Sequence, residues 1–165
     1  MKTLALVVPC YNEAEVLKMF YQKTSEVIRT LSSEYQAEFV FVDDGSRDDT
    51  LKIIKELAAG DRNVKYISFS RNFGKESAML AGMEYAVKAD YIGILDADLQ
   101  HSPTLIPEML HYVDKEGYDV AAAMRKDREG EAKFKSFLSG SFYKVINKIS
   151  ETKIIDSAQD FRVMR

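Results

Sequence analysis

Four aspartates at the ends of apolar runs are candidates for metal chemistry in this 165-residue chain. Asp43 and Asp44 end or follow the run at 37–43, and Asp96 and Asp98 end or follow the run at 90–96. Carboxylates brought close together repel one another unless cations or hydrogen-bond donors compensate them. Asp96 and Asp98 are two positions apart in an extended segment and can point the same way. Their oxygen atoms suit a hard divalent cation, so Mg²⁺ or Mn²⁺ is the expected ion.

Other polar residues near these aspartates have simpler explanations. Asp48, Asp49 and Thr50 open a predicted helix, and capping explains them better than ligand binding does. Gly45 is expected to provide a turn conformation. Two interpretations of His101 remain open: it lies in a surface turn, or it acts as a metal ligand or an acid–base group.

The elements that must hold these residues follow from the hydrophobic pattern. Apolar runs of strand length occupy 3–9, 37–43, 63–69, 90–96 and 118–124. Between them, apolar residues recur with helical spacing over 14–31, 49–59, 76–88 and 103–113. This alternation predicts an α/β fold, with a mostly parallel central sheet and helices on both faces. Ligands of such sheets bind beyond the carboxyl ends of the strands, where three of the four strand ends provide carboxylates.

Two further expectations concern the third helix and the end of the chain. The apolar face of the helix over 76–88 is predicted to consist of Met79, Leu80, Met83 and Val87. Another helix is expected over 131–149, and the last residues, 160–165, resemble a strand. Because the chain ends there without a closing helix, we interpret residues 1–165 as one domain that is truncated at its C-terminal end.

Composition narrows the class of protein. With 46% hydrophobic and 30% charged residues, the chain is expected to be globular rather than disordered. No apolar run approaches the roughly 18 residues of a membrane-spanning helix, and the N-terminus does not resemble a signal peptide. The single cysteine, Cys10, cannot form an internal disulfide, which fits a reducing compartment and predicts a cytosolic location.

Charge is distributed unevenly along the chain. The formal net charge is −3, yet residues 125–148 carry seven basic and three acidic side chains. Such a segment indicates an anionic partner, although the solvent-exposed face of a helix explains it equally well. Neither GxGxxG nor GxxxxGK[ST] occurs, which argues against a dinucleotide-dependent oxidoreductase and a P-loop hydrolase. A phosphate-bearing ligand would therefore depend on a metal and on side chains such as Arg125 and Arg128.

Five segments, in this order and spacing, resemble glycosyltransferase family 2: VVPCYNE, VDDGSRDDT, RNFGKESAMLAGM, DADLQHSP and AQDFRVM. The subgroup they resemble most includes dolichyl-phosphate mannosyltransferases and bactoprenol (undecaprenyl-phosphate) glucosyltransferases. The resemblance extends from Leu4 to Met164. It implies a GT-A fold and an inverting, metal-dependent glycosyltransferase.

The resemblance also implies roles for individual residues. Asp96 and Asp98 would form the metal-and-diphosphate motif, and Asp98 is counted among the catalytic residues. Asp160 is the first choice for the catalytic base and Asp156 the second. The residues implied to bind the nucleotide sugar are Pro9, Tyr11, Glu13, Asp43, Asp44, Lys75, Asp96, Gln100, Arg125, Arg128 and Arg162.

The implied reaction moves a hexose from a nucleotide sugar of the UDP-glucose or GDP-mannose type, with UDP-glucose preferred, to a polyprenyl phosphate. A phosphate acceptor is already anionic, so it hardly needs a base. The alternatives are a soluble or polysaccharide acceptor, and a non-catalytic metal- or nucleotide-binding α/β domain. We expect the full-length protein at the cytoplasmic face of a membrane, with no nucleic-acid partner, and leave homo-oligomerisation open.

Overall fold

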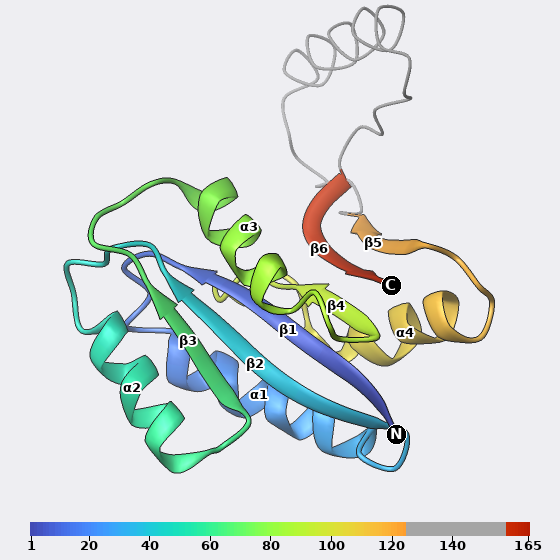
Figure 1. Ribbon diagram of the computed structural model, residues 1–165. Coiled ribbons are helices and arrows are strands. Elements are labelled where there is room, and N and C mark those ends of the chain that lie inside the picture. The colour runs from blue at the N-terminus through green and yellow to red at the C-terminus, as the bar shows by residue number, and fades with distance from the viewer. Residues whose placement is uncertain (125–157) are drawn as a thin grey trace, which may run out of the picture. The chain divides into compact units, whose positions relative to one another are not determined.

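The computed structural model describes residues 1–124 and 158–165 (Figure 1). Along the chain the elements are β1 (Lys2–Cys10), α1 (Leu17–Thr30), β2 (Tyr35–Asp43), α2 (Thr50–Gly60), β3 (Val64–Ser68), α3 (Lys75–Tyr85), β4 (Tyr91–Ile94), the 3₁₀ turn η1 (Pro103–Leu105), α4 (Ile106–Asp114), β5 (Val120–Met124) and β6 (Ala158–Met164). The helix predicted over 131–149 lies outside the described residues. In the part that is described, no helix combines the length and the apolar character needed to cross a membrane.

The chain divides into two compact units. The first contains residues 1–122 and 160–165, and the second contains residues 123–159. All the interactions that build the site described below belong to the first unit.

The six strands form one sheet in the order β3-β2-β1-β4-β6-β5. β1 pairs in parallel with β2 and β4, and β2 pairs in parallel with β3. β6 is antiparallel to β4, with Ile94 opposite Arg162. Because β6 runs backwards, it begins at the edge where β4 ends. The mostly parallel α/β sheet predicted from the sequence is thus confirmed. Asp160, near the start of β6, lies beside the residues that follow β4.

The two faces of the sheet are covered by different helices, as predicted (Figure 1). On one face, Phe41 of β2 meets Phe20 of α1 edge-on, with ring centroids 6.5 Å apart. On the other face, Val7 of β1 and Val40 of β2 belong to a buried cluster against which Met83 of α3 packs. Side chains alternate along each strand, so both faces of β1 and β2 are buried, which explains why their sequences are apolar almost throughout.

The predicted apolar face of α3 is confirmed for Met79 and Met83, which pack against the buried cluster, and is wrong for the other two residues. Leu80 and Val87, which were assigned to it, are 55% and 73% exposed. The buried positions of this segment are Ala78, Gly82 and Ala86. A Cβ atom on Gly82 would lie 2.3 Å from Cγ1 of Val7 in β1, so α3 approaches the sheet through small residues. The helical pattern favoured large apolar side chains, whereas close packing here requires small ones.

Candidate active site

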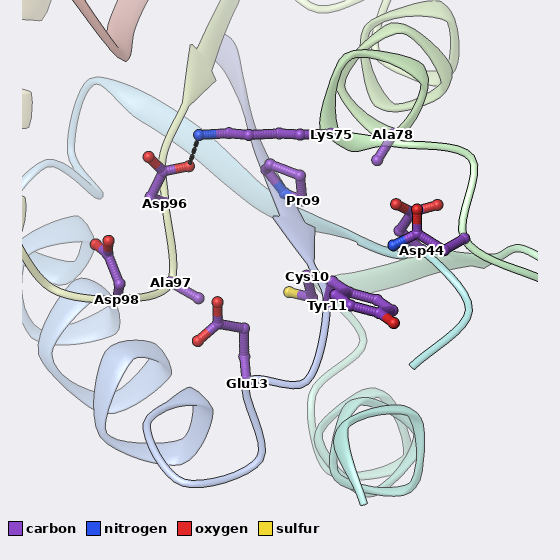
Figure 2. A pocket seen from close by; sticks show the side chains of 11 residues that line it. Pro9, Cys10, Tyr11, Glu13, Asp44, Lys75, Ala78, Asp96, Ala97 and Asp98 are labelled. Carbon is purple, nitrogen blue, oxygen red and sulfur yellow. Dashed lines mark ion pairs between the residues drawn. The ribbon is translucent and has the colours of Figure 1, made fainter. Parts of the chain in front are cut away.

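A pocket of about 260 Å³ opens at the carboxyl ends of the parallel strands. Seven residues that the sequence predicted for the site line it: Pro9, Tyr11, Glu13, Asp44, Lys75, Asp96 and Asp98. Figure 2 shows the three carboxylates of Glu13, Asp96 and Asp98 toward one side of the pocket, with Tyr11 and Asp44 toward the other. The remaining lining residues, Cys10, Asn72, Ala78 and Ala97, were not predicted. No chemical signal in the sequence distinguishes them, since they line the pocket through their position alone.

The loops that follow β1 and β2 are joined by reciprocal hydrogen bonds. The Asn12 amide donates to Ser46 Oγ at 3.0 Å, and the Arg47 amide donates to Asn12 Oδ1 at 2.8 Å. Asn12 adopts a positive φ of 57°, which asparagine tolerates better than most residues. These bonds fix the backbone on either side of Asn12 and so place Tyr11 and Glu13 at the pocket.

A second pair of bonds continues this connection into α2. Asp48 Oδ1 accepts the Thr50 amide at 3.0 Å, while Asp48 Oδ2 accepts the Ala14 amide at 3.1 Å. Burial raises the pKa of Asp48, but hydrogen bonds from Thr50 outweigh it, so the pKa lies below its usual value. Asp49 occupies the N-cap position without a side-chain cap hydrogen bond. The predicted capping hydrogen bond is thus made by Asp48, while Asp49 takes the N-cap position without one.

Asp43 and Asp44 are 1% and 3% exposed, and both organise neighbouring loops. Asp44 accepts the amides of Phe73 at 2.7 Å and Gly74 at 2.9 Å, just before α3 begins. Asp43 accepts the Ser46 amide at 3.2 Å. Both carboxylates thus accept hydrogen bonds from backbone amides of the protein itself. The binding of a nucleotide base by either residue stays a prediction.

Gly45 adopts the expected turn, with a positive φ of 68°. A Cβ atom at this position would lie 2.3 Å from the backbone carbonyl carbon of Arg71. The loop after β2 therefore needs glycine for two reasons, its conformation and its close approach to the loop after β3.

Glu13 lies close enough to the Asp96–Asp98 pair to feel its charge. The pKa of Glu13 is raised, first by burial and then by the carboxylates of Asp98 and Asp96. Asp98 is exposed, and its Oδ1 accepts the Gln100 amide at 3.0 Å. Asp44, Asp96 and Asp98 of the predicted group of four aspartates line the same pocket, and Glu13 joins them there.

These carboxylates fit a divalent cation that shares its coordination shell with a ligand. Among residues 1–124 and 158–165, no group of three His, Cys, Asp or Glu side chains is arranged to hold a metal ion by itself. Mg²⁺ is commonly bound by one or two carboxylates, with the remaining positions filled by water and substrate phosphates. The hard oxygen atoms of Asp96 and Asp98, in a wall whose negative charge already raises the pKa of Glu13, match this mode of binding.

Lys75 joins the pocket to Asp160. Its Nζ lies 2.6 Å from Asp96 Oδ1 and 2.8 Å from Asp160 Oδ2, and Figure 2 shows it reaching across to Asp96. Burial lowers the pKa of Lys75, but the hydrogen bonds to Asp160 and Asp96 raise it by more than burial lowers it. The net shift of the pKa is therefore upward. The hydrogen bond from Lys75 also holds the pKa of Asp160 below its usual value. Asp160 is thus an ionised group beside a cation.

Arg162 flanks Asp160 on its other side, with Nη2 3.0 Å from Asp160 Oδ1. Its Nε is buried and finds no hydrogen-bond partner among the described residues. The ring of His101 packs against Phe161, with centroids 5.9 Å apart, an arrangement that fits a structural role. Three predicted residues, Asp156, Arg125 and Arg128, lie outside the described residues.

Comparison with known proteins identifies the family. The family model described as Glycosyl transferase family 2 matches residues 5–165. The chain is 42% identical over 163 residues to the bactoprenol glucosyl transferase of Shigella phage SfV, covering 98% of this chain and 51% of the relative. It is also 42% identical over 163 residues to the uncharacterized glycosyltransferase sll0501 of Synechocystis sp., covering 98% of this chain and 49% of the relative. The chain thus spans about half the length of these relatives.

The fold agrees with a solved structure of more distant sequence. Glucosyl-3-phosphoglycerate synthase from Mycobacterium tuberculosis, in complex with Mn²⁺, UDP and phosphoglyceric acid, matches with a TM-score of 0.64 and 19% identity, over 99% of this chain and 55% of that chain. This likeness confirms the GT-A fold that the sequence resemblance implied. With the family model covering nearly every residue and the relatives sharing two fifths of their aligned positions, the chain belongs to glycosyltransferase family 2.

Proposed function

We propose that this chain is the donor-binding catalytic domain of an inverting glycosyltransferase that moves a hexose from a nucleotide sugar, UDP-glucose in the first instance, to a polyprenyl phosphate. The observation that carries the proposal is the grouping of Asp96, Lys75 and Asp160 at one pocket edge. It supports the proposal because a carboxylate suited to a metal ion, just after β4, lies next to an ionised acid on β6. The name of the Shigella phage relative supports the sugar and the lipid acceptor.

The donor half of the reaction is assigned to the pocket beyond β1 and β4. Tyr11, 39% exposed at the pocket, offers an aromatic surface to the nucleoside. Asp96 and Asp98 would hold Mg²⁺ or Mn²⁺, which when bound supplies positive charge for the leaving diphosphate. Preorganised positive charge of this kind stabilises the charge that develops on a leaving group.

The acceptor half is assigned to Asp160 and Arg162. A carboxylate held between Lys75 and Arg162 is a weak proton acceptor, because both cations favour its ionised form. Such a group suits an acceptor that needs no deprotonation, and the oxygen of a phosphate monoester is already anionic near neutral pH. The Arg162 guanidinium, on a side chain that is 37% exposed, offers that phosphate charged donors. We therefore assign the binding of the acceptor phosphate to Arg162, and its orientation opposite the leaving group, as inversion requires, to the Asp160–Arg162 pair.

Calorimetric titration tests the donor site. UDP, GDP, UDP-glucose and GDP-mannose are titrated into the wild-type chain with and without Mn²⁺, and the series is repeated with Asp98→Asn. We expect metal-dependent binding of the uridine ligands, weakened on the order of tenfold or more by Asp98→Asn, because the negative charge of a metal ligand is lost. Glu84→Gln, which removes an exposed carboxylate on α3, is the control that should bind as wild type does.

Transfer from radiolabelled UDP-glucose to undecaprenyl phosphate in detergent tests the acceptor. Appearance of label in the lipid product, in the presence of Mn²⁺ or Mg²⁺, supports the proposal. Tight binding of UDP-glucose without lipid product, together with label in a soluble or polysaccharide acceptor, would overturn the acceptor assignment. Metal binding without recognition of any nucleotide would instead favour a non-catalytic domain.

A further inference from the structure

The backbone just before Lys75, at the start of α3, is held in place by hydrogen bonds. The amides of Phe73 and Gly74, immediately before it, donate to the buried carboxylate of Asp44 at 2.7 and 2.9 Å. Gly74 at the N-cap has a positive φ of 98°, which lets the chain turn into α3. The backbone position of Lys75 is therefore fixed by Asp44, which directly follows β2, and not by the loop before α3 alone.

From this position the ammonium group reaches two carboxylates, one just after a strand and one on the neighbouring strand. Asp96 follows β4, and Asp160 lies on β6, which pairs antiparallel with β4. The distances from Nζ are 2.6 Å to Asp96 and 2.8 Å to Asp160. The exposed fractions of the three side chains are 39%, 29% and 36%, so the contacts are only partly shielded from water. They are close enough for each carboxylate to be oriented by the lysine.

The contact with Asp96 has a consequence for metal binding. An ammonium group at 2.6 Å already neutralises part of the charge that would attract a divalent cation to Asp96. Among the described residues, the ion pairs of Lys75 are with Asp96 and Asp160. Asp98 instead accepts the backbone amide of Gln100. Removing the lysine would leave Asp96 free for a metal ion and would leave Asp160 with Arg162 as its neighbouring cation.

We propose that Lys75 is a positioning residue that ties the donor-side carboxylate Asp96 to the acceptor-side carboxylate Asp160 and competes with the divalent cation for Asp96. The inference rests on the proposed function, since it assumes that Asp96 and Asp160 serve the two halves of the transfer. It assigns Lys75 a role different from a simple ligand of the donor diphosphate. When the metal ion engages Asp96, the bridge opens on that side and the ammonium remains with Asp160.

The proposal predicts opposite effects on metal affinity and on transfer. In Lys75→Met, which keeps the length of the side chain without its charge, Mn²⁺ alone should bind about threefold to fivefold tighter, the scale of a partly exposed ion pair. The rate constant kcat for transfer should fall on the order of tenfold because Asp160 loses its orientation. Lys75→Arg, which keeps the charge, should return Mn²⁺ affinity toward the wild-type value.

The experiment titrates Mn²⁺ alone into wild type, Lys75→Met, Lys75→Arg and the control Lys88→Met, whose lysine is exposed beyond α3. Circular dichroism and thermal unfolding establish that each variant is folded. Folded Lys75→Met with unchanged or weaker Mn²⁺ binding would overturn the proposal. So would weaker UDP binding with unchanged Mn²⁺ affinity, because that pattern identifies a phosphate ligand.

The same titrations separate this inference from the proposed function. If wild type binds neither Mn²⁺ nor nucleotides and Asp98→Asn changes nothing, the donor site itself is misassigned and both proposals fail. If wild type shows metal-dependent nucleotide binding that Asp98→Asn weakens, while Lys75→Met matches wild type in Mn²⁺ affinity, only the role of Lys75 fails.

Discussion

Asp114, the last residue of α4, shows how a single carboxylate can join several elements away from the site. Its side chain is 1% exposed and receives hydrogen bonds from Lys2, Tyr35 and Tyr91 at the starts of β1, β2 and β4. Lys115 adds an ion pair at 3.2 Å. This cluster was not predicted, because nothing in the sequence pattern of α4 indicates that the starts of three strands meet its last residue.

The hydrogen bonds from Lys2 and Tyr35, in that order, hold the pKa of Asp114 far below its usual value of 3.8. A lowered pKa in the folded state means that the ionised group stabilises folding above the unfolded pKa, and that this contribution is lost as pH falls toward the folded pKa. Asp114→Asn should therefore lower the free energy of unfolding by about 2 kcal/mol at pH 7, and the difference from wild type should shrink below about pH 4.

Urea unfolding followed by circular dichroism at pH 7, 5 and 3.5 measures this difference. Asp119→Asn is the matched control, because that carboxylate is 83% exposed and its ion pair with Arg165 should contribute little. A destabilisation by Asp114→Asn that stays constant across this pH range would show that charge is not what Asp114 contributes.

At the scale of elements, the distance between α3 and the sheet depends on Gly82. A methyl group there would come within 2.3 Å of Val7 Cγ1 and 3.2 Å of Val42 Cγ2. Both valines are fully buried and stiff, so the helix must shift outward. Alanine is a better helix former than glycine by about 1 kcal/mol. The overlap should nevertheless make Gly82→Ala destabilising by roughly 1–3 kcal/mol.

Thermal and urea unfolding of Gly82→Ala and Gly60→Ala tests this expectation. Gly60 ends α2, and a Cβ atom there would meet nothing within 4 Å. Gly60→Ala should therefore be neutral or slightly stabilising. Equal effects of the two substitutions would mean that helix propensity, not close packing, decides the stability of α3. The shift of α3 in Gly82→Ala should also lower the rate of transfer, since Lys75, which contacts Asp160, begins this helix.

The sequence was sufficient to predict the order of elements, because the spacing of apolar residues distinguishes strands from helices. It was also sufficient to predict the edge of the sheet that carries the carboxylates, because parallel strands all end at the same edge. It was insufficient for the face of α3, where small residues set the contact. The Lys75 bridge also escaped prediction. It depends on β6 lying antiparallel beside β4, a pairing between segments some seventy positions apart that leaves no periodic signal in either segment.

At the scale of the whole molecule, charge is divided between a negative and a positive portion of the chain. Residues 1–124 carry 13 basic and 20 acidic side chains, whereas residues 125–148 carry seven basic and three acidic ones. A polyprenyl phosphate resides in a bilayer, and basic side chains near an anionic surface contribute about 1 kcal/mol each to binding. We therefore expect the basic segment, rather than the net charge of the chain, to bring the domain to anionic membranes.

Sedimentation with vesicles separates these two explanations. The triple variant Lys133→Gln, Lys135→Gln, Lys144→Gln should bind phosphatidylglycerol vesicles on the order of tenfold to a hundredfold more weakly than wild type at low salt. The control replaces three exposed lysines of the first unit, Lys23, Lys52 and Lys55, with glutamine and changes the net charge equally. It should retain most of the binding, because those lysines are not part of the basic segment. Equal loss in both triple variants would show that the basic segment has no special part in the attraction, and strong binding to purely phosphatidylcholine vesicles would show that the attraction is not electrostatic.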